Sequence, residues 1–302
     1  MDDKRGSLDS TASINSANSV VIEGGCSLEE CVTRVKARLL SHYEECENDF
    51  YNKDVALFIQ RDEFNFVERY LQKFKFDIER TVDVMKKTLQ WRKAKGISQM
   101  TDASFPAIFY KYGLMFIFKT DIDGNLVFHF RVRLKEKFHP DIEEAFKLFY
   151  SYLLFKIDQM AATIGRQWLY LGDFSNCAMR NLDVQLLLWG LNLCVEKYPA
   201  GLKAILVYNL PWFAKPVFTA ALKLMPYSLR SIVEVIDKSK LNNYIPAENL
   251  PKYLGGSETK DPRMIIPENC VGLRDYFCQL PDDVFKKNLD QCEKIICNVW
   301  GK

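Results

Sequence analysis

The sequence has few histidines and no paired cysteines. Its 302 residues include three histidines and nine cysteines, and no C-x-x-C pair occurs. The closest cysteine spacings are Cys26/Cys31 and Cys292/Cys297. Zinc sites need clustered cysteine and histidine ligands, so we expect no metal and no cofactor. Reduced thiols of a cytoplasmic protein are a better explanation of the cysteines than disulfides.

The sequence also has little net charge and no long apolar run. A formal net charge of +2 does not mark a nucleic-acid binder, so no nucleic acid is expected as a partner. No stretch reaches the roughly 18 apolar residues of a membrane-spanning helix. Residues 1–26 are polar, lack the apolar core of a signal peptide and predict a disordered arm. We expect a cytoplasmic protein, with peripheral attachment to endomembranes as an alternative.

Sequence motifs of common enzyme classes are missing as well. There is no Walker A motif, no G-x-G-x-x-G after a strand and no G-x-S-x-G. His129 lies between aromatic residues in a strand pattern, which favours a core histidine over a catalytic base. We therefore predict a non-catalytic protein and assign no catalytic or metal-binding residue.

Residues 27–100 have the periodicity of a helical N-terminal lobe. Helices are predicted over 27–45, 61–76 and 78–95. Ser27 and Glu30 have the spacing of a capping box, Asp77 is placed as an N-cap, and Gly96 ends the third helix.

After Tyr112 the pattern changes to alternating strands and helices. Residues 113–132 form two β-type runs around Asp123-Gly124, which is typical of a hairpin. Strands at 166–174, 203–210 and 231–237 then alternate with helices at 141–162, 181–198 and 212–225. This order predicts an α/β fold in which helices flank a mixed, mostly parallel sheet.

Five segments, in chain order, carry a family resemblance. They are FNFVERYLQKFKFDIERTVDVMKKTLQWR (64–92), DGNLVFHFRV (123–132), WLYLGDFSN (168–176), YPAGLKAILVYNLPWFAKPVFTAALKLMP (198–226) and IPAENLPKYLGG (245–256). From about residue 54 to 257 the chain resembles the CRAL-TRIO lipid-binding family, which includes the yeast phosphatidylinositol/phosphatidylcholine transfer protein. The resemblance implies a lipid domain at 101–257, with an apolar cavity on the sheet and a helical gate.

The resemblance also implies which residues meet a lipid and a membrane. The gate is placed at Trp212–Met225, and the cavity and gate residues are Phe116, Phe118, Phe128, Phe130, Leu169, Leu171, Tyr208, Trp212, Phe213, Val217, Phe218, Ala221, Leu222 and Met225. Lipid headgroups or the membrane surface would be met by Lys215, Lys223 and Arg230. An ordinary core helix and a sheet covered on both faces would explain the same apolar runs without a ligand.

The identity of the lipid stays open. Family members that bind phosphatidylinositol place a glutamate just after the Tyr-Pro pair and a lysine after the gate. This chain has Ala200 after Tyr198-Pro199, and Ser231 at the lysine position with Arg230 beside it. A neutral or hydrophobic ligand is therefore as compatible with the sequence as phosphatidylinositol.

The tail at 258–302 contains a predicted amphipathic helix at 284–300. Its apolar stripe is Phe285, Leu289, Cys292, Ile296 and Val299. The helix could dock onto the domain, lie on a membrane or bind a protein partner. Two functions follow from the resemblance: non-catalytic binding and intermembrane transfer of a lipid, or an adaptor that keeps the fold without a lipid cavity.

Overall fold

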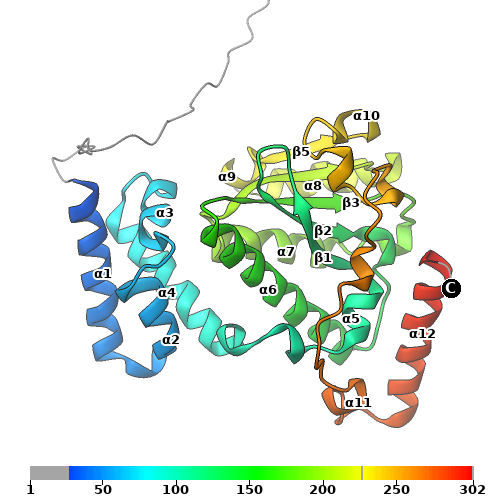
Figure 1. Ribbon diagram of the computed structural model, residues 1–302, viewed down its shortest axis with the longest axis horizontal. Helices are drawn as coiled ribbons and strands as arrows, with labels where there is room; N and C mark the ends of the chain where they lie inside the picture. Colours follow the sequence, from blue (N-terminus) through cyan, green and yellow to red (C-terminus); the bar gives the residue numbers. More distant parts are fainter. Residues whose placement is uncertain (1–26, 226, 301–302) are drawn as a thin grey trace, which may run out of the picture.

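A computed structural model describes residues 27–225 and 227–300, so the polar arm predicted at 1–26 lies outside the described residues. The first elements are helical: α1 (Leu28–Glu45), α2 (Asn52–Val55) with a π turn at Ala56–Gln60, α3 (Phe66–Lys73) and α4 (Ile78–Lys95). They pack together at one end of the molecule (Figure 1).

The ends of these helices follow from local hydrogen bonds. Ser27 and Glu30 form the expected capping box, and Asp77 accepts a hydrogen bond from the backbone N–H of Arg80 at 2.9 Å. Gly96 ends α4 with a φ of +68°, which glycine adopts without strain. The helix predicted at 61–76 is wrong at its start, because Asn65 has a left-handed φ of 49° and α3 begins only at Phe66.

The sheet has five strands in the order β1-β2-β3-β4-β5: β1 (Met115–Thr120), β2 (Leu126–Arg131), β3 (Trp168–Asp173), β4 (Leu202–Tyr208) and β5 (Val233–Ile236). β1 and β2 are antiparallel and the other neighbours are parallel, which confirms the predicted mixed, mostly parallel sheet. In the hairpin turn, Asp121 accepts hydrogen bonds from the backbone N–H groups of Asp123 and Asn125, and Gly124 has a φ of +81°.

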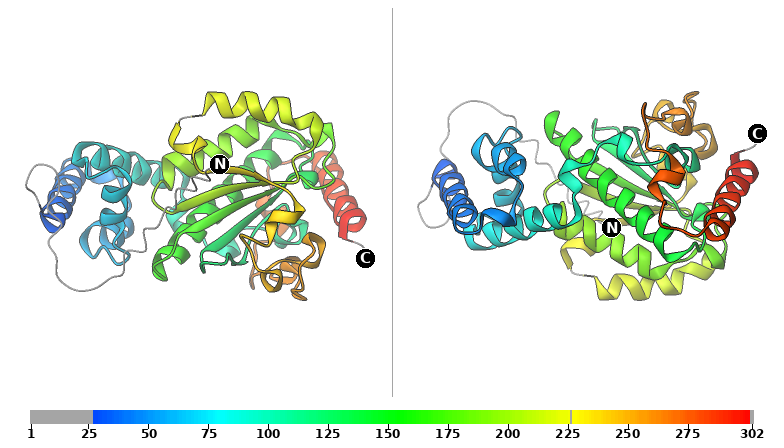
Figure 2. Two further views of the ribbon diagram at one scale, coloured as in Figure 1. Left: turned by 90° about the horizontal axis from the view of Figure 1, so that it is seen from above. Right: turned by 90° about the horizontal axis from the view of Figure 1, so that it is seen from below.

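Helices and an irregular segment cover opposite faces of this sheet. The helices after the lobe are α5 (Ala107–Tyr112), α6 (Pro140–Thr163), α7 (Val184–Lys197), α8 (Lys215–Leu224), α9 (Tyr227–Arg230) and α10 (Lys238–Leu241). The larger core packs α6, α7 and α8 on one face, while Leu241, Ile245, Leu250 and Leu254 pack on the other. Figure 2 shows this layering, with the segment that follows α10 on the face away from α8.

The tail folds back onto the domain through α11 (Leu273–Tyr276) and α12 (Asp282–Trp300). Phe285, Leu289 and Cys292 of α12 face Ile108 and Ile142 of the domain, as the docking alternative predicted; the side chain of Val299 lies outside the described part. Between residues 27 and 300, residue 226 apart, no helix has the length and apolar character needed to cross a bilayer.

Candidate functional site

An apolar pocket lies between the sheet and helices α7 and α8. Its walls come from every strand except β1, from α7 and from α8 with the residues just before and after it. The lining residues are Phe130, Val132, Tyr170, Gly172, Phe174, Leu182, Val184, Leu187, Leu188, Leu191, Ile205, Val207, Leu210, Ala214, Val217, Phe218, Ala221, Met225 and Val233. None of them carries a charge, so the pocket suits a hydrocarbon ligand.

Strand alternation decides which sheet residues reach the pocket. Successive side chains of a strand point to opposite faces, and the parallel register aligns Phe130 with Gly172 and Gly172 with Val207. Gly172 has no side chain, so the floor is lower there than at its neighbours.

Helix α8 covers the pocket and is lightly held. Among its ten residues only Ala221 is buried, whereas Val217 is 37% exposed. An element with few buried apolar contacts opens at low free-energy cost. The pocket is nearly filled: its volume is about 50 Å³, against roughly 300–1,000 Å³ for small-molecule sites. A lipid would therefore need α8 or its side chains to move outward.

Of the residues assigned to the cavity from the sequence, five line this pocket: Phe130 on β2 together with Val217, Phe218, Ala221 and Met225 of the gate segment. Phe128 is on the same face but is buried under α6, with its ring 5.5 Å from that of Tyr150. Phe213 and Leu222 are half-buried beside the core and are not part of the lining. Trp212 is 81% exposed.

Five other assigned residues lie on the sheet face away from the pocket. Leu169, Leu171 and Tyr208 belong to the core under the segment after α10. Phe116 and Phe118 contact the ring of His129, at centroid distances of 4.8 and 6.3 Å. The physical reason is alternation: these positions have the opposite parity to Phe130, Gly172 and Val207.

Of the pocket residues that sequence reasoning missed, the largest group lies on α7 and just before it. One wall of the pocket is formed by Leu182, Val184, Leu187, Leu188 and Leu191. This helix is apolar on all sides (LLLWGLNL), so its sequence has no polar face that would indicate which residues point inward.

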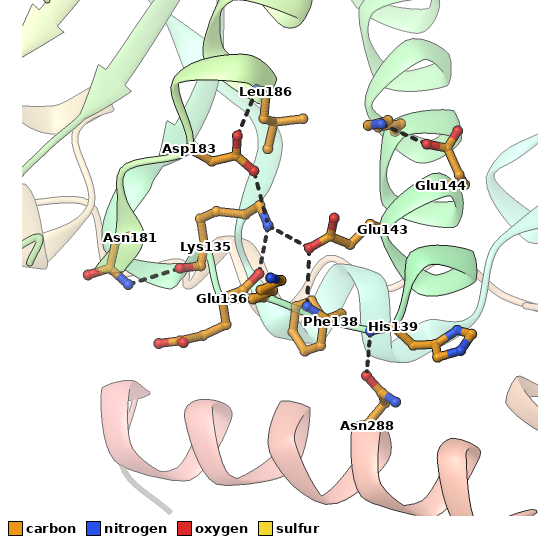
Figure 3. A network of polar contacts seen from close by, with 12 residues as sticks. Lys135, Glu136, Phe138, His139, Glu143, Glu144, Asn181, Asp183, Leu186 and Asn288 are labelled. Atoms are coloured by element: carbon orange, nitrogen blue, oxygen red, sulfur yellow. Dashed lines mark hydrogen bonds and ion pairs between the residues drawn. The ribbon is translucent and has the colours of Figure 1, made fainter. Parts of the chain in front are cut away.

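A polar network fixes the beginning of α7 (Figure 3). Asp183 caps the helix by accepting a hydrogen bond from the backbone N–H of Leu186 at 2.9 Å. The Nζ atom of Lys135 lies 3.5 Å from the Asp183 carboxylate and 3.1 Å from that of Glu143 on α6. The Asn181 side-chain amide donates to the backbone carbonyl of Lys135 at 2.9 Å. The half-buried ammonium group of Lys135 therefore connects the start of α7, which forms part of the pocket wall, to α6.

The three basic residues assigned to headgroups lie outside the pocket. Lys215 and Lys223 are exposed on α8, and Arg230 is exposed at the end of α9. Arg230 donates a hydrogen bond to the backbone carbonyl of Met225 at 3.5 Å. Large apolar side chains are exposed nearby, since Leu224 is 79% and Tyr227 is 80% exposed. This surface combines apolar and cationic groups, as a membrane-contacting surface does.

The region after the Tyr-Pro pair is closely packed at Gly201. A Cβ atom on Gly201 would lie 1.7 Å from Oδ1 of Asp158 and 2.6 Å from Nε1 of Trp168. Asp158 is buried, accepts a hydrogen bond from Trp168 at 3.1 Å, and burial raises the pKa of its carboxyl. The space beside Gly201 is thus occupied by the protein's own carboxyl and indole groups.

Two buried polar residues of the sheet, His129 and Asp173, have surroundings that explain them structurally. His129 is buried, and burial lowers its pKa to about 3, so its ring is neutral near pH 7. Asp173 accepts a hydrogen bond from the backbone N–H of Ser175 at 2.9 Å, which caps the loop after β3.

Comparison with known proteins places residues 110–256 in a family. The sequence profile of the family described as CRAL/TRIO domain matches these residues. Tyrosine-protein phosphatase non-receptor type 9 from Homo sapiens is 24% identical over 198 residues, which cover 64% of this chain and 33% of that protein. The protein of the same name from Rattus norvegicus gives the same values. The chain thus spans about a third of the length of these curated relatives.

A solved structure supports the assignment of the fold. The structure titled "Crystal structure of Sfh5" has a TM-score of 0.51 to this chain at 14% identity, covering 87% of this chain and 96% of that one. The likeness confirms the predicted fold class of a helical lobe followed by a mixed sheet with flanking helices. The profile match thus shows that residues 110–256 are similar to the CRAL/TRIO domain, and the likeness to the solved structure shows the fold.

Proposed function

We propose that the chain is a non-catalytic lipid-binding protein that holds the apolar part of a lipid between the sheet and α8. The observation that carries the proposal is the pocket lining, which contains no charged side chain. Each buried methylene group is worth about 0.8 kcal/mol. A diacyl lipid with about thirty methylenes therefore needs roughly 25 kcal/mol of apolar shelter outside a bilayer, and an uncharged enclosure is the kind of site that supplies it.

In this proposal α8 is the gate, and the surface around it meets the membrane. Opening α8 would enlarge a pocket of about 50 Å³ and turn Phe218 toward the bilayer. The exposed side chains of Trp212, Leu224 and Tyr227 support insertion at the interface. Lys215 and Lys223 add attraction to anionic headgroups. Transfer would then occur at the cytoplasmic surface of endomembranes.

The gate is tested by lipid transfer between liposomes. We expect Phe218→Asp to abolish transfer, because an ionised carboxylate in the apolar pocket is costly. Thr219→Asp is the matched control, since Thr219 is an exposed neighbour on the same helix and does not line the pocket. Equal transfer by the wild type and Phe218→Asp would overturn the gate assignment.

The small pocket volume favours one second candidate, an adaptor that keeps the fold with a filled cavity. A volume of about 50 Å³ is below the roughly 300 Å³ at which ligand sites begin. An adaptor of this kind would purify without lipid and would not transfer lipid under any conditions. It would still bind membranes or a protein through its surface.

We also infer a closer relationship within the family, to the N-terminal region of motile sperm domain-containing protein 2. The segments FVERYL, QWRK and DGNLVFHFRV and the pairing of NLPW with LPKYLGG support this inference. A higher identity of residues 27–257 to some other family member would overturn it. The phosphatase activity in the name of the relatives belongs to those proteins, of which this chain spans about a third.

A further inference from the structure

Three side chains with metal-binding atoms meet where α1 ends, far along the chain from the lipid pocket. The ligand-type atoms of His42, Cys46 and Asp49 all lie within 4.8 Å of one another. Nε2 of His42 is 2.9 Å from Oδ2 of Asp49. His42 and Asp49 are half-buried and Cys46 is exposed.

Backbone hydrogen bonds hold these three residues close together at the end of α1. His42 is in the last turn of α1, and Cys46, four residues on, is the C-cap residue that ends the helix. The backbone N–H of Cys46 donates to the carbonyl of His42 at 2.9 Å, and that of Asp49 donates to the carbonyl of Cys46 at 2.9 Å. The three side chains therefore start from one continuous hydrogen-bonded turn.

A residue from another helix orients the carboxylate. Nε2 of Gln90 on α4 donates to Oδ2 of Asp49 at 2.8 Å. Hydrogen bonds of this kind to a ligating carboxylate are a regular part of protein metal sites.

We propose that His42, Cys46 and Asp49 form a zinc(II) site with Gln90 as its positioning residue. Bonds of about 2.0–2.3 Å in a tetrahedron separate the ligand atoms by about 3.5 Å, so the His42–Asp49 pair needs to open by about half an ångström to admit the ion. An imidazole, a thiolate and a carboxylate suit zinc. Calcium and magnesium are disfavoured because they require several oxygen ligands, and this site has one carboxylate.

The site would clip the end of α1 to the turn that follows it and leave one coordination position for water. Three protein ligands leave the fourth tetrahedral position open, and the exposure of Cys46 gives solvent access to it. The spacing H-x₃-C-x₂-D contains a single cysteine and a single histidine, which is why cysteine pairing in the sequence did not indicate it.

Cobalt(II) titration of the full chain under reducing, metal-free conditions tests the site. We expect one equivalent of cobalt to give tetrahedral d–d bands and a thiolate-to-cobalt charge-transfer band, both removed by an excess of zinc. Cys46→Ser should lose the charge-transfer band and bind at least tenfold more weakly. Cys278→Ser, which changes an exposed cysteine elsewhere, should behave as the wild type.

Two further variants separate metal ligation from an effect on folding. One keeps the shape of a ligand side chain, and the other changes a residue that is not a ligand. Asp49→Asn keeps the side-chain shape and should weaken binding at least tenfold, with an unchanged circular dichroism spectrum. Gln90→Ala should weaken binding about tenfold while keeping the charge-transfer band. No cobalt spectrum in the wild type, or an equal spectrum in Cys46→Ser, would overturn the proposal and leave His42 and Asp49 as an ion pair only.

Discussion

Phe130 on β2 and Gly172 on β3 are partners in the parallel ladder, and both line the apolar pocket. The large ring beside a residue without a side chain leaves the floor of the pocket uneven. A Cβ atom on Gly172 would lie 3.5 Å from the Phe174 ring and 3.6 Å from the Tyr170 ring, which are ordinary van der Waals distances. A larger side chain would therefore extend into the pocket rather than displace the sheet.

We predict that Gly172→Val reduces lipid binding and transfer several-fold. The isopropyl group would occupy the space over β3, and overpacking would cost about 1–3 kcal/mol of stability at most. Gly172→Ala should have a smaller effect in the same direction. Binding of a fluorescent lipid measures the first quantity and thermal unfolding the second; undiminished binding by Gly172→Val would contradict the role of this pocket.

The buried His129 predicts acid sensitivity. Its pKa is about 3 in the folded state and about 6.5 in the unfolded state. The unfolded chain binds the proton more readily between these values, so the contribution of His129 is present above pH 6.5 and declines as the pH falls. We expect a loss of about 2 kcal/mol in the free energy of unfolding between pH 7 and pH 5 from this residue.

Comparison with His129→Phe isolates that effect, because buried carboxyl groups with raised pKa values, such as Asp158, remain in both proteins. An aromatic ring at 129 can still stack on Phe116. Urea unfolding at pH 7 and pH 5 should give a smaller loss of stability for the variant. Parallel pH dependences for the two proteins would argue against a buried neutral histidine.

Docking of α12 predicts a stability effect at Asn288. Its Oδ1 atom accepts a hydrogen bond from the backbone N–H of His139 at 3.1 Å, and its Nδ2 donates to the Val284 carbonyl at 2.8 Å. Asn288→Ala should lower the free energy of unfolding by about 1–2 kcal/mol, because the N–H of the half-buried His139 loses its partner. Asn298→Ala, at an exposed position of the same helix, should have almost no effect in urea unfolding. Equal stabilities of the two variants would mean that α12 is not held at this contact.

The cationic surface on α8 predicts charge-dependent membrane binding. Replacing Lys215 and Lys223 together by glutamine should weaken binding to anionic vesicles by about 2 kcal/mol, or roughly 30-fold, at about 1 kcal/mol per lysine. Replacing the exposed Lys286 and Lys287 of α12 by glutamine is the matched control. Vesicle co-sedimentation measures both, and a similar loss in the control would point to a different membrane surface.

Much of the fold could be predicted because its local signals agree. The predicted helix at 78–95 matches α4, where Asp77 and Gly96 mark both ends. The hairpin, the parallel strands and the long α6 were recognisable from turn chemistry and from apolar runs of different lengths. Helix α5 was missed because its six residues, Ala107–Tyr112, are too few for a periodic pattern.

The pocket was less predictable, for a reason visible in two strands. FHF (128–130) and WLYL (168–171) are apolar or aromatic at successive positions because both faces of the sheet are covered. Such runs do not reveal which alternate side chains point toward α8 and which point toward the segment after α10. Tertiary packing decides this, and it places Tyr170 and Leu171 on opposite faces.

The central claim is that this chain holds a lipid under α8, and its most direct test is extraction of the purified wild-type protein followed by lipid mass spectrometry. The account predicts a lipid at up to one equivalent per chain, depleted in Phe218→Asp and retained in Thr219→Asp. The lipid class found would also decide between phosphatidylinositol and a neutral ligand. Protein that carries no lipid, and takes up none from liposomes, would contradict the account and favour the adaptor.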